Sequence, residues 1–114
     1  MRSIFIASPY STPDGEQVAV NVRKSMAAWH ELEEWGFAGH CPLLTHFLHM
    51  HQPKLRRTWL THDNHWLLKC DCVLRLPGES EGADAECVLA HRHHIPVFYS
   101  VADIVEFYRT QPEA

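Results

Sequence analysis

The chain has 114 residues, of which 46% are hydrophobic and 21% are charged, and these values are typical of a single soluble globular domain covering residues 1–114. It carries 10 Lys and Arg against 14 Asp and Glu, a formal net charge of −4 that argues against nonspecific binding of nucleic acid. No apolar run reaches the roughly 18 residues that a membrane span needs, and the apolar run at the start is too short for a signal peptide. We therefore expect neither a membrane nor a nucleic acid as a partner.

Strand and helix patterns alternate along the chain. In order they predict a strand at residues 3–8, a turn at 11–15, a helix at 16–35 and a strand at 37–41. Residues 43–51 fit either a short helix or an ordered loop, and residues 52–57 form a polar connection. The second half predicts a helix at 58–69, a strand at 71–76, a helix at 81–93, a strand at 95–99 and a last helix at 101–109.

This alternation predicts an α/β fold, namely a small parallel sheet of four to five strands with helices on both faces, Rossmann-like or flavodoxin-like. In such sheets a ligand binds beyond the carboxyl ends of the strands. That rule places residues 7–14, 41–46 and 77–82 around one crevice. We therefore expect Ser8, Pro9 and His46 to contact a ligand.

Four cysteines are present: Cys41, Cys70, Cys72 and Cys87. Their spacing is not that of a zinc ribbon. We interpret all four as reduced thiols, which predicts a cytoplasmic protein.

The segment after the third strand, PGESEGADAE at residues 77–86, turns from a strand into a helix. Ser80 is expected to cap that helix, which leaves N–H groups around Gly82 free to bind an anion. Glu86 lies about a turn and a half into the helix, where its carboxylate can point back toward the crevice. The alternative is a capped surface helix whose acids are solvated.

Two short motifs lie in order along the chain: Asp63-x-x-Trp66-Leu67, and then Ser80-x-Gly82-x-x-x-Glu86. Between them a strand opens at Asp71. Together with the apolar opening strand, this order resembles the nucleoside 2-deoxyribosyltransferase superfamily, which includes the 2′-deoxynucleoside 5′-phosphate N-hydrolases. The resemblance runs over roughly residues 3–99 and is closest to small uncharacterised members of the superfamily.

The resemblance implies a role for each motif. It makes Glu86 the nucleophile that attacks C1′ of the deoxyribose and Asp63 the acid that assists the departing base, which is the logic of a two-carboxylate glycosidase. Ser80 takes the position that binds the 5′ end of the sugar, where a hydroxyl suits a phosphate and a carboxylate would repel it. The neighbouring Glu79 and Glu81 add negative charge there, which acts against a phosphate.

Phe5 departs from the family pattern. Members usually carry a tyrosine in the first strand, whose hydroxyl orients the nucleophilic glutamate, and Phe5 holds that position close to the substrate. Tyr10, at the exit of the strand, either supplies the missing hydroxyl or packs as a loop aromatic over the crevice. Phe5 therefore bears directly on whether the chain is a catalyst.

Histidines are numerous, and two of them, His46 and His49, would share a helix face. Such a pair can ligate a metal, but no neighbouring Cys or carboxylate completes a tetrahedral set, and we expect no metal site. A role for His46 near a bound ligand is the preferred interpretation.

The predicted function is N-glycosidic bond cleavage, or deoxyribosyl transfer, on a 2′-deoxynucleoside or its 5′-monophosphate. No cofactor is expected, because the carboxylates carry the chemistry. The resemblance also implies a homodimer or larger homo-oligomer. Two alternatives stay open: a non-catalytic nucleotide-binding module on the same scaffold, and hydrolysis of another N-glycoside such as the nicotinamide bond of NAD.

Overall fold

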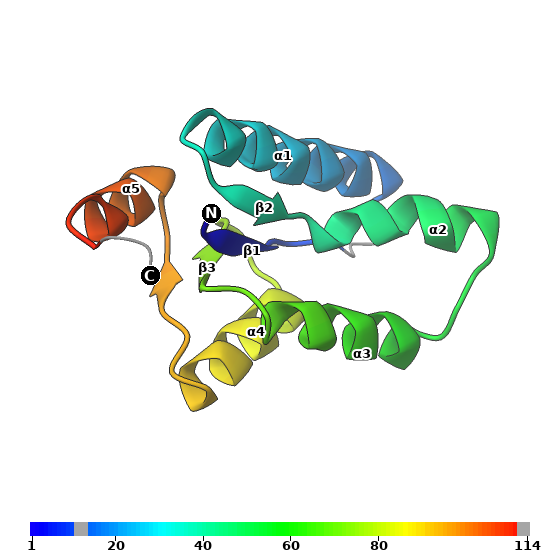
Figure 1. Ribbon diagram of the computed structural model, residues 1–114. Helices are drawn as coiled ribbons and strands as arrows, with labels where there is room; N and C mark the ends of the chain where they lie inside the picture. The colour runs from blue at the N-terminus through cyan, green and yellow to red at the C-terminus, as the bar shows by residue number, and fades with distance from the viewer. Residues whose placement is uncertain (11–13, 112–114) are drawn as a thin grey trace.

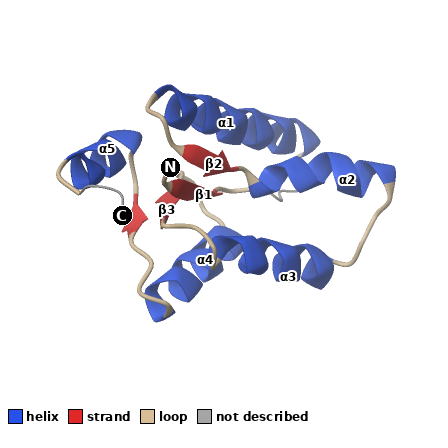
Figure 2. Cartoon of the chain, viewed as in Figure 1, coloured by secondary structure: helices blue, strands red, loops and turns tan. Residues whose placement is uncertain are grey.

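The computed structural model describes residues 1–10 and 14–111, so most of the turn predicted at 11–15 lies outside the described residues. The elements follow in this order: β1 (Ser3–Ala7), α1 (Gly15–Glu34), β2 (Ala38–His40), the 3₁₀ turn η1 (Pro42–Leu44), α2 (Thr45–His51), α3 (Arg56–Leu67), β3 (Cys72–Arg75), α4 (Glu81–Arg92), β4 (Val97–Phe98) and α5 (Val101–Arg109). Strands and helices alternate as the sequence predicts (Figures 1 and 2).

The four strands form one parallel sheet in the order β2-β1-β3-β4. In the register Ile4 lies beside Cys72 and Phe5 beside Val73. The carboxylate of Asp71 accepts a hydrogen bond from the Ser3 backbone N–H at 2.7 Å, which ties the start of β1 to the start of β3. This arrangement confirms the predicted α/β class and the parallel sheet.

The sheet buries both faces, because alternate side chains of a strand point to opposite sides. On one face, Ile4, Ile6 and Leu74 pack with residues of α1 and α5. On the other, Phe5 and Val73 pack with residues of α3 and α4. Helices therefore cover both faces (Figure 1), and apolar strands of this kind are typical of a sheet covered on both sides.

The helix ends follow the local sequence signals. The Asp14 carboxylate accepts from the Glu16 N–H at 2.9 Å and caps α1. Gly36, with a φ of +83°, follows the end of that helix, as its position in the sequence predicts. Ser80 accepts from the Ala83 N–H at 3.0 Å, which confirms the predicted cap of α4.

The middle of the chain shows which of the two alternatives for residues 43–51 is correct. Residues 43–51 are helical, as a 3₁₀ turn opened by Pro42 and then α2. Helix α3 begins at Arg56, two residues before the predicted start. The prediction missed this start because Leu55, at the N-cap position, has no side chain that can cap a helix. Strand β4 is shorter than predicted, since Pro96 lacks an N–H and only Val97 and Phe98 pair with β3.

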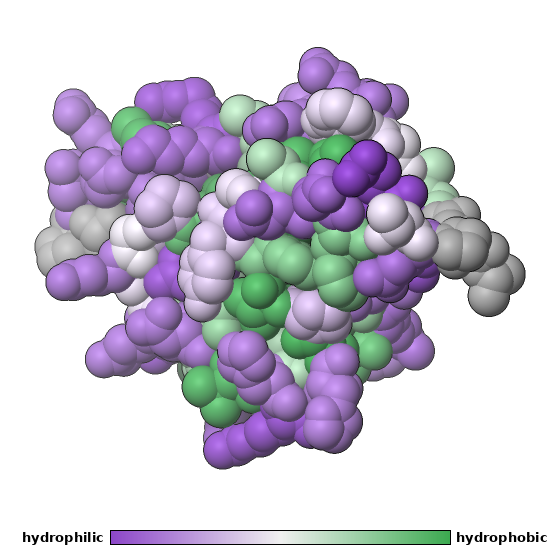
Figure 3. All heavy atoms as spheres, turned by 90° about the vertical axis from the view of Figure 1, so that its left-hand side faces the viewer, coloured by the Kyte–Doolittle hydropathy of each residue, from purple (hydrophilic) through white to green (hydrophobic). Residues whose placement is uncertain are grey.

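Figure 3 shows the side of the molecule on which α5 lies, where hydrophilic side chains surround a smaller area of hydrophobic ones. All four cysteines are free thiols. Within residues 1–10 and 14–111, no helix is both long enough and apolar enough to cross a membrane.

Candidate active site

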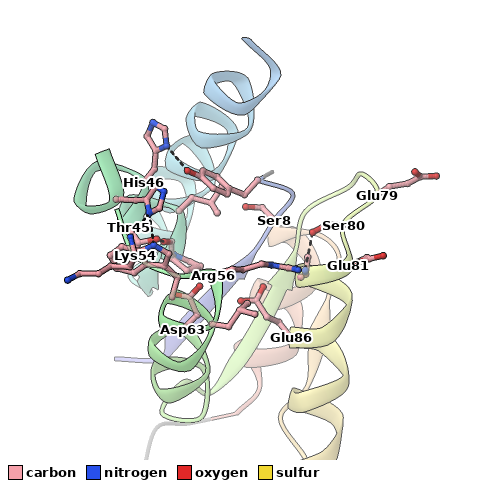
Figure 4. A pocket seen from close by; sticks show the side chains of 18 residues that line it. Ser8, Thr45, His46, Lys54, Arg56, Asp63, Glu79, Ser80, Glu81 and Glu86 are labelled. Atoms are coloured by element: carbon pink, nitrogen blue, oxygen red, sulfur yellow. Dashed lines mark hydrogen bonds between the residues drawn. The ribbon is translucent and has the colours of Figure 1, made fainter. Parts of the chain in front are cut away.

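A pocket of about 760 Å³ opens beyond the carboxyl ends of β1 and β3, between helices α2, α3 and α4 (Figure 4). Ser8 and Tyr10 follow β1, His46 lies on α2, and Ser80 begins α4, so each of the three segments predicted to meet at one crevice contributes to it. Helix α3 adds a further wall that includes Asp63.

Glu86 lies deep in this pocket on α4. The residue is only 7% exposed, and within residues 1–10 and 14–111 no hydrogen bond holds its carboxylate. Burial and, to a smaller extent, the nearby charge of Asp63 raise the pKa of Glu86, the charge of Arg75 lowers it, and the net result is a pKa of about 8. In the free pocket Glu86 therefore keeps its proton at neutral pH.

Asp63 faces Glu86 from α3. Figure 4 shows the two side chains pointing toward one another from opposite walls. Burial raises the pKa of Asp63 to about 6, and its Oδ1 atom is buried without a hydrogen-bond partner. The two carboxyl groups thus share a desolvated space, and at neutral pH they hold one proton between them, chiefly on Glu86.

The opposite end of the pocket presents hydrogen-bond donors. It contains Ser80 and Gly82, and the backbone N–H groups of Glu81 and Gly82 have no partner there, whereas that of Ala83 donates to the Ser80 hydroxyl. The Ser8 hydroxyl also lines the pocket; it is 7% exposed and its oxygen has no hydrogen-bond partner. These donors can bind an anion.

Arg75 fixes the turn that carries this end of the pocket. Its guanidinium donates to the carbonyl oxygens of Leu76 and Gly78, the second at 2.9 Å, and to Asp84 Oδ1 at 3.0 Å. The Arg75 side chain is 10% exposed. One buried cation therefore joins the end of β3, the turn and the first half of α4.

The aromatic and histidine side chains of the pocket pair with one another. The Tyr10 hydroxyl lies 2.7 Å from His46 Nδ1, so that hydroxyl is engaged by His46. His49 Nδ1 accepts from Trp59 Nε1 at 2.9 Å and from the Lys54 N–H at 3.2 Å. In the described part of the chain, no group of three His, Cys, Asp or Glu side chains is arranged to hold a metal ion.

Two of the predicted contact residues are not among those that line this pocket. Phe5 is fully buried in the core beneath α4, with its ring stacked on His40 at 5.6 Å between centroids. Pro9 lines a smaller pocket on the other side of the loop, together with Asn21. The residues that the structure does bring together are these: Ser8, Tyr10, His46, Asp63, Ser80, Gly82 and Glu86.

Several pocket residues were not anticipated from the sequence. Arg56 and Trp59 line the pocket beside Asp63, and Lys54 lies just before them. A signal was present, because Arg56, Trp59 and Asp63 are spaced by three, four and seven residues and so share one helix face. Placing residues 52–57 in a connection removed Arg56 from that pattern.

The comparisons with known proteins agree with the fold. A family model described as "Domain of unknown function (DUF7768)" matches residues 2–100. A solved 2-deoxyribosyltransferase from the psychrotolerant bacterium Bacillus psychrosaccharolyticus, described as a biocatalyst for nucleoside synthesis, is similar with a TM-score of 0.60 and 16% identity, over 83% of this chain and 69% of that chain. At that identity the likeness shows a shared fold. No curated protein sequence matches the chain.

Proposed function

The chain belongs to the family described as Domain of unknown function (DUF7768), and with that membership and the deoxyribosyltransferase-like fold as premises, we propose that it cleaves or transfers the N-glycosidic bond of a 2′-deoxynucleoside or its 5′-monophosphate. One observation carries the proposal: Asp63 and Glu86 face each other in one desolvated pocket. Two facing carboxyl groups that share a proton are what a double-displacement glycosidase uses.

The proposed reaction starts with the proton of Glu86. It moves to Asp63, which leaves Glu86 ionised. The Glu86 carboxylate then attacks C1′ of the deoxyribose, the bond from C1′ to the base nitrogen breaks, and Asp63 gives its proton to the departing base. Water, or a second base, attacks C1′ of the glycosyl-enzyme, Glu86 leaves as a carboxylate, and the incoming group's proton returns to the pair. No cofactor enters this cycle.

The substrate end of the proposal rests on the donors around Ser80. A 5′-phosphate would accept hydrogen bonds from the Ser80 and Ser8 hydroxyls and from the free N–H groups at the start of α4. Ser80 lies six residues before Glu86, about 9 Å along a helix. That spacing lets one end of a nucleotide lie at Ser80 while its sugar lies against Glu86.

A homo-oligomer is part of the proposal. Helix α2 exposes large apolar side chains next to the pocket: Phe47 at 53%, Leu48 at 60% and Met50 at 67%. A second copy of the chain would cover these side chains and close the pocket on its open side. Light scattering coupled to size-exclusion chromatography should give at least twice the 13.2 kDa mass of the chain. A monomer at high concentration would contradict this part of the proposal.

The direct test is a panel of 2′-deoxynucleosides and their 5′-monophosphates, with released base followed by chromatography. The wild type should release base, and Glu86→Gln and Asp63→Asn should lose turnover by roughly a thousandfold or more. Adding a second free base separates the two activities, since only a transferase forms a new nucleoside. Glu33→Gln, on the exposed face of α1 and outside the pocket, is the matched control for loss of a carboxylate.

A non-catalytic nucleotide-binding module is the second candidate, and a specific observation favours it. Phe5 supplies no hydroxyl, and no group in the described chain hydrogen-bonds to the Glu86 carboxylate. A wild type that binds the monophosphates by calorimetry and releases no base from any of them would establish this second function.

A further inference from the structure

Arg56 begins helix α3 and reaches into the pocket. Its side chain extends across the cavity toward Ser80 and Glu81 at the start of α4 (Figure 4). Arg56 and Asp63 are seven residues apart, two helical turns, and so lie on the same face of α3. Within residues 1–10 and 14–111, Arg56 forms no ion pair and no side-chain hydrogen bond. A free guanidinium is therefore available opposite the donors of α4.

The position that Arg56 faces contains a buried, unpaired donor. The Ser8 hydroxyl lies inside the pocket (Figure 4), where the residue is 7% exposed and its oxygen has no partner. A buried hydroxyl without a hydrogen bond is costly, and a ligand that accepts from it removes that cost. Ser8 is independent of the helix terminus, because it follows strand β1.

The charge of the pocket explains what Arg56 adds. Four carboxyl groups line the cavity, those of Asp63, Glu79, Glu81 and Glu86. A phosphate dianion at the start of α4 would lie between Glu79 and Glu81 and would be repelled by both. A cation from the facing wall would offset that repulsion, and of the two cationic side chains that line the pocket, Lys54 and Arg56, it is Arg56 that points toward this position.

We propose that Arg56 is the specificity-determining residue that makes the pocket accept a 5′-phosphorylated substrate in preference to the corresponding nucleoside. The proposal rests on the proposed function above. The planar guanidinium would bind two phosphate oxygens from the α3 side, while the Ser8 hydroxyl and the α4 N–H groups bind from the other. The phosphate would thereby link the two facing walls through its own oxygens.

The test uses inorganic phosphate, which the reaction does not consume, titrated calorimetrically into the full-length wild type and three variants. Arg56→Gln should raise the dissociation constant of phosphate roughly ten- to a hundredfold, because it removes charged hydrogen bonds. Arg56→Lys keeps the positive charge but loses the planar guanidinium with its paired donors, so its dissociation constant should lie between those of the wild type and Arg56→Gln. Arg57→Gln, the exposed neighbour that does not line the pocket, is the matched control and should bind as the wild type does.

The second arm compares substrates. Arg56→Gln should lower kcat/KM for the 5′-monophosphates by the same factor and leave kcat/KM for the nucleosides unchanged. An unchanged phosphate affinity in Arg56→Gln, or an equal loss in Arg57→Gln, would overturn the inference. Arg56-dependent phosphate binding without any base release would support Arg56 as the anion ligand and overturn the proposed reaction. Base release that is equally fast from nucleosides and monophosphates, and unchanged in Arg56→Gln, would support the proposed reaction and overturn the role of Arg56.

Discussion

The two walls of the pocket are held in place in different ways. On one side, α4 has a Ser80 cap, buries Ala83, Glu86 and Ala90, and is joined to the sheet by Arg75. On the other side, α2 has no capping side chain and no buried residue, and α3 buries only Leu67.

This difference separates the proposed roles. The α4 wall is positioned by the sheet, so the proposed nucleophile on it has a fixed place. The α2–α3 wall is positioned by contacts between its own members, such as the hydrogen bond from Trp59 to His49. The wall with fewer core contacts carries Asp63 and Arg56, the residues proposed to meet the base and the phosphate. Segments with few core contacts are those that adjust most easily to a ligand.

The largest expected effect concerns the burial of Glu86 in the α4 wall. Its pKa is raised from 4.5 to about 8, so the native state binds more protons than the unfolded chain between those values. Stability should therefore fall as the pH rises from about 5 to 8, by on the order of 4 kcal/mol in total, since each pH unit contributes about 1.4 kcal/mol. Urea unfolding at several pH values measures it.

Glu86→Gln should remove most of that pH dependence, because the neutral amide replaces the titrating group, while Asp63, whose pKa is raised to about 6, still contributes a smaller fall below about pH 6. The exposed Glu79→Gln should leave it as in the wild type. A wild-type stability that is constant from pH 5 to 8 would mean that Glu86 is better solvated than its burial indicates.

The next effect concerns Phe5, which lies in the core beneath the α4 wall. Phe5→Tyr should raise turnover ten- to a hundredfold, because a hydrogen bond to a charged group is worth about 1.5–3 kcal/mol. The new hydroxyl would orient the Glu86 carboxylate and favour its ionised form. Tyr10→Phe should be silent, since the Tyr10 hydroxyl pairs with His46. Loss of turnover in Tyr10→Phe would instead make Tyr10 the orienting group.

A substitution at Gly78 tests the turn that leads from β3 into the α4 wall. Its φ is +118°, and a Cβ there would lie 2.9 Å from Pro9 Cγ. Gly78→Ala should lower the free energy of unfolding by about 1–3 kcal/mol through strain and contact. Thermal unfolding measures the loss. Gly15→Ala is the matched control, because a Cβ at Gly15 meets nothing within 4 Å.

Trp59 tests the other wall. Trp59→Phe removes the hydrogen bond to His49 Nδ1 and should cost about 0.5–1.5 kcal/mol of stability, measured by urea unfolding. Trp35→Phe, at a side chain that is 60% exposed, should change little. Equal effects of the two substitutions would show that the Trp59 contact does not fasten α2 to α3.

The smallest effect on stability is expected at Gly82. A Cβ there would meet only Ser80 Oγ at 3.9 Å, an ordinary contact. Gly82→Ala should therefore keep or raise stability, by up to about 1 kcal/mol, because alanine is the better helix former. Phosphate binding should weaken, since the new methyl would occupy space beside the anion. Unchanged phosphate affinity would place the anion elsewhere.

The parts of the fold that depend on short-range signals could be predicted from the sequence. The Ser80 cap, the end of α1 before Gly36 and the parallel sheet follow from patterns a few residues long. The pairing of Asp63 with Glu86 did not come from periodicity; it came from the resemblance of two motifs to a family. Nothing local links two residues on different helices.

The residues that were missed depend on tertiary contacts. The sequence pattern predicts Arg75 as an ordinary polar position in a strand. Only the fold shows that its side chain is buried and donates to three oxygen acceptors. Arg56 was placed in a connection because Leu55 gives no capping signal. Phe5 was assigned to the site through its match to the family tyrosine, and only the packing shows that its ring lies in the core beneath α4. Pro9 was expected at the crevice as part of the loop after β1, but it lines a smaller pocket.

The position of β1 in the sheet affects how the protein is made. Its neighbours on both sides, β2 and β3, come later in the chain, and the hydrogen bond from Ser3 to Asp71 spans 68 residues. During synthesis the apolar strand at Ile4–Ile6 leaves the ribosome before both of its neighbours and stays unpaired on its β3 edge until Cys72–Arg75 has emerged. Unpaired apolar strands aggregate. The β3 edge of β1 is therefore an aggregation-prone edge until its partner strand has been synthesised.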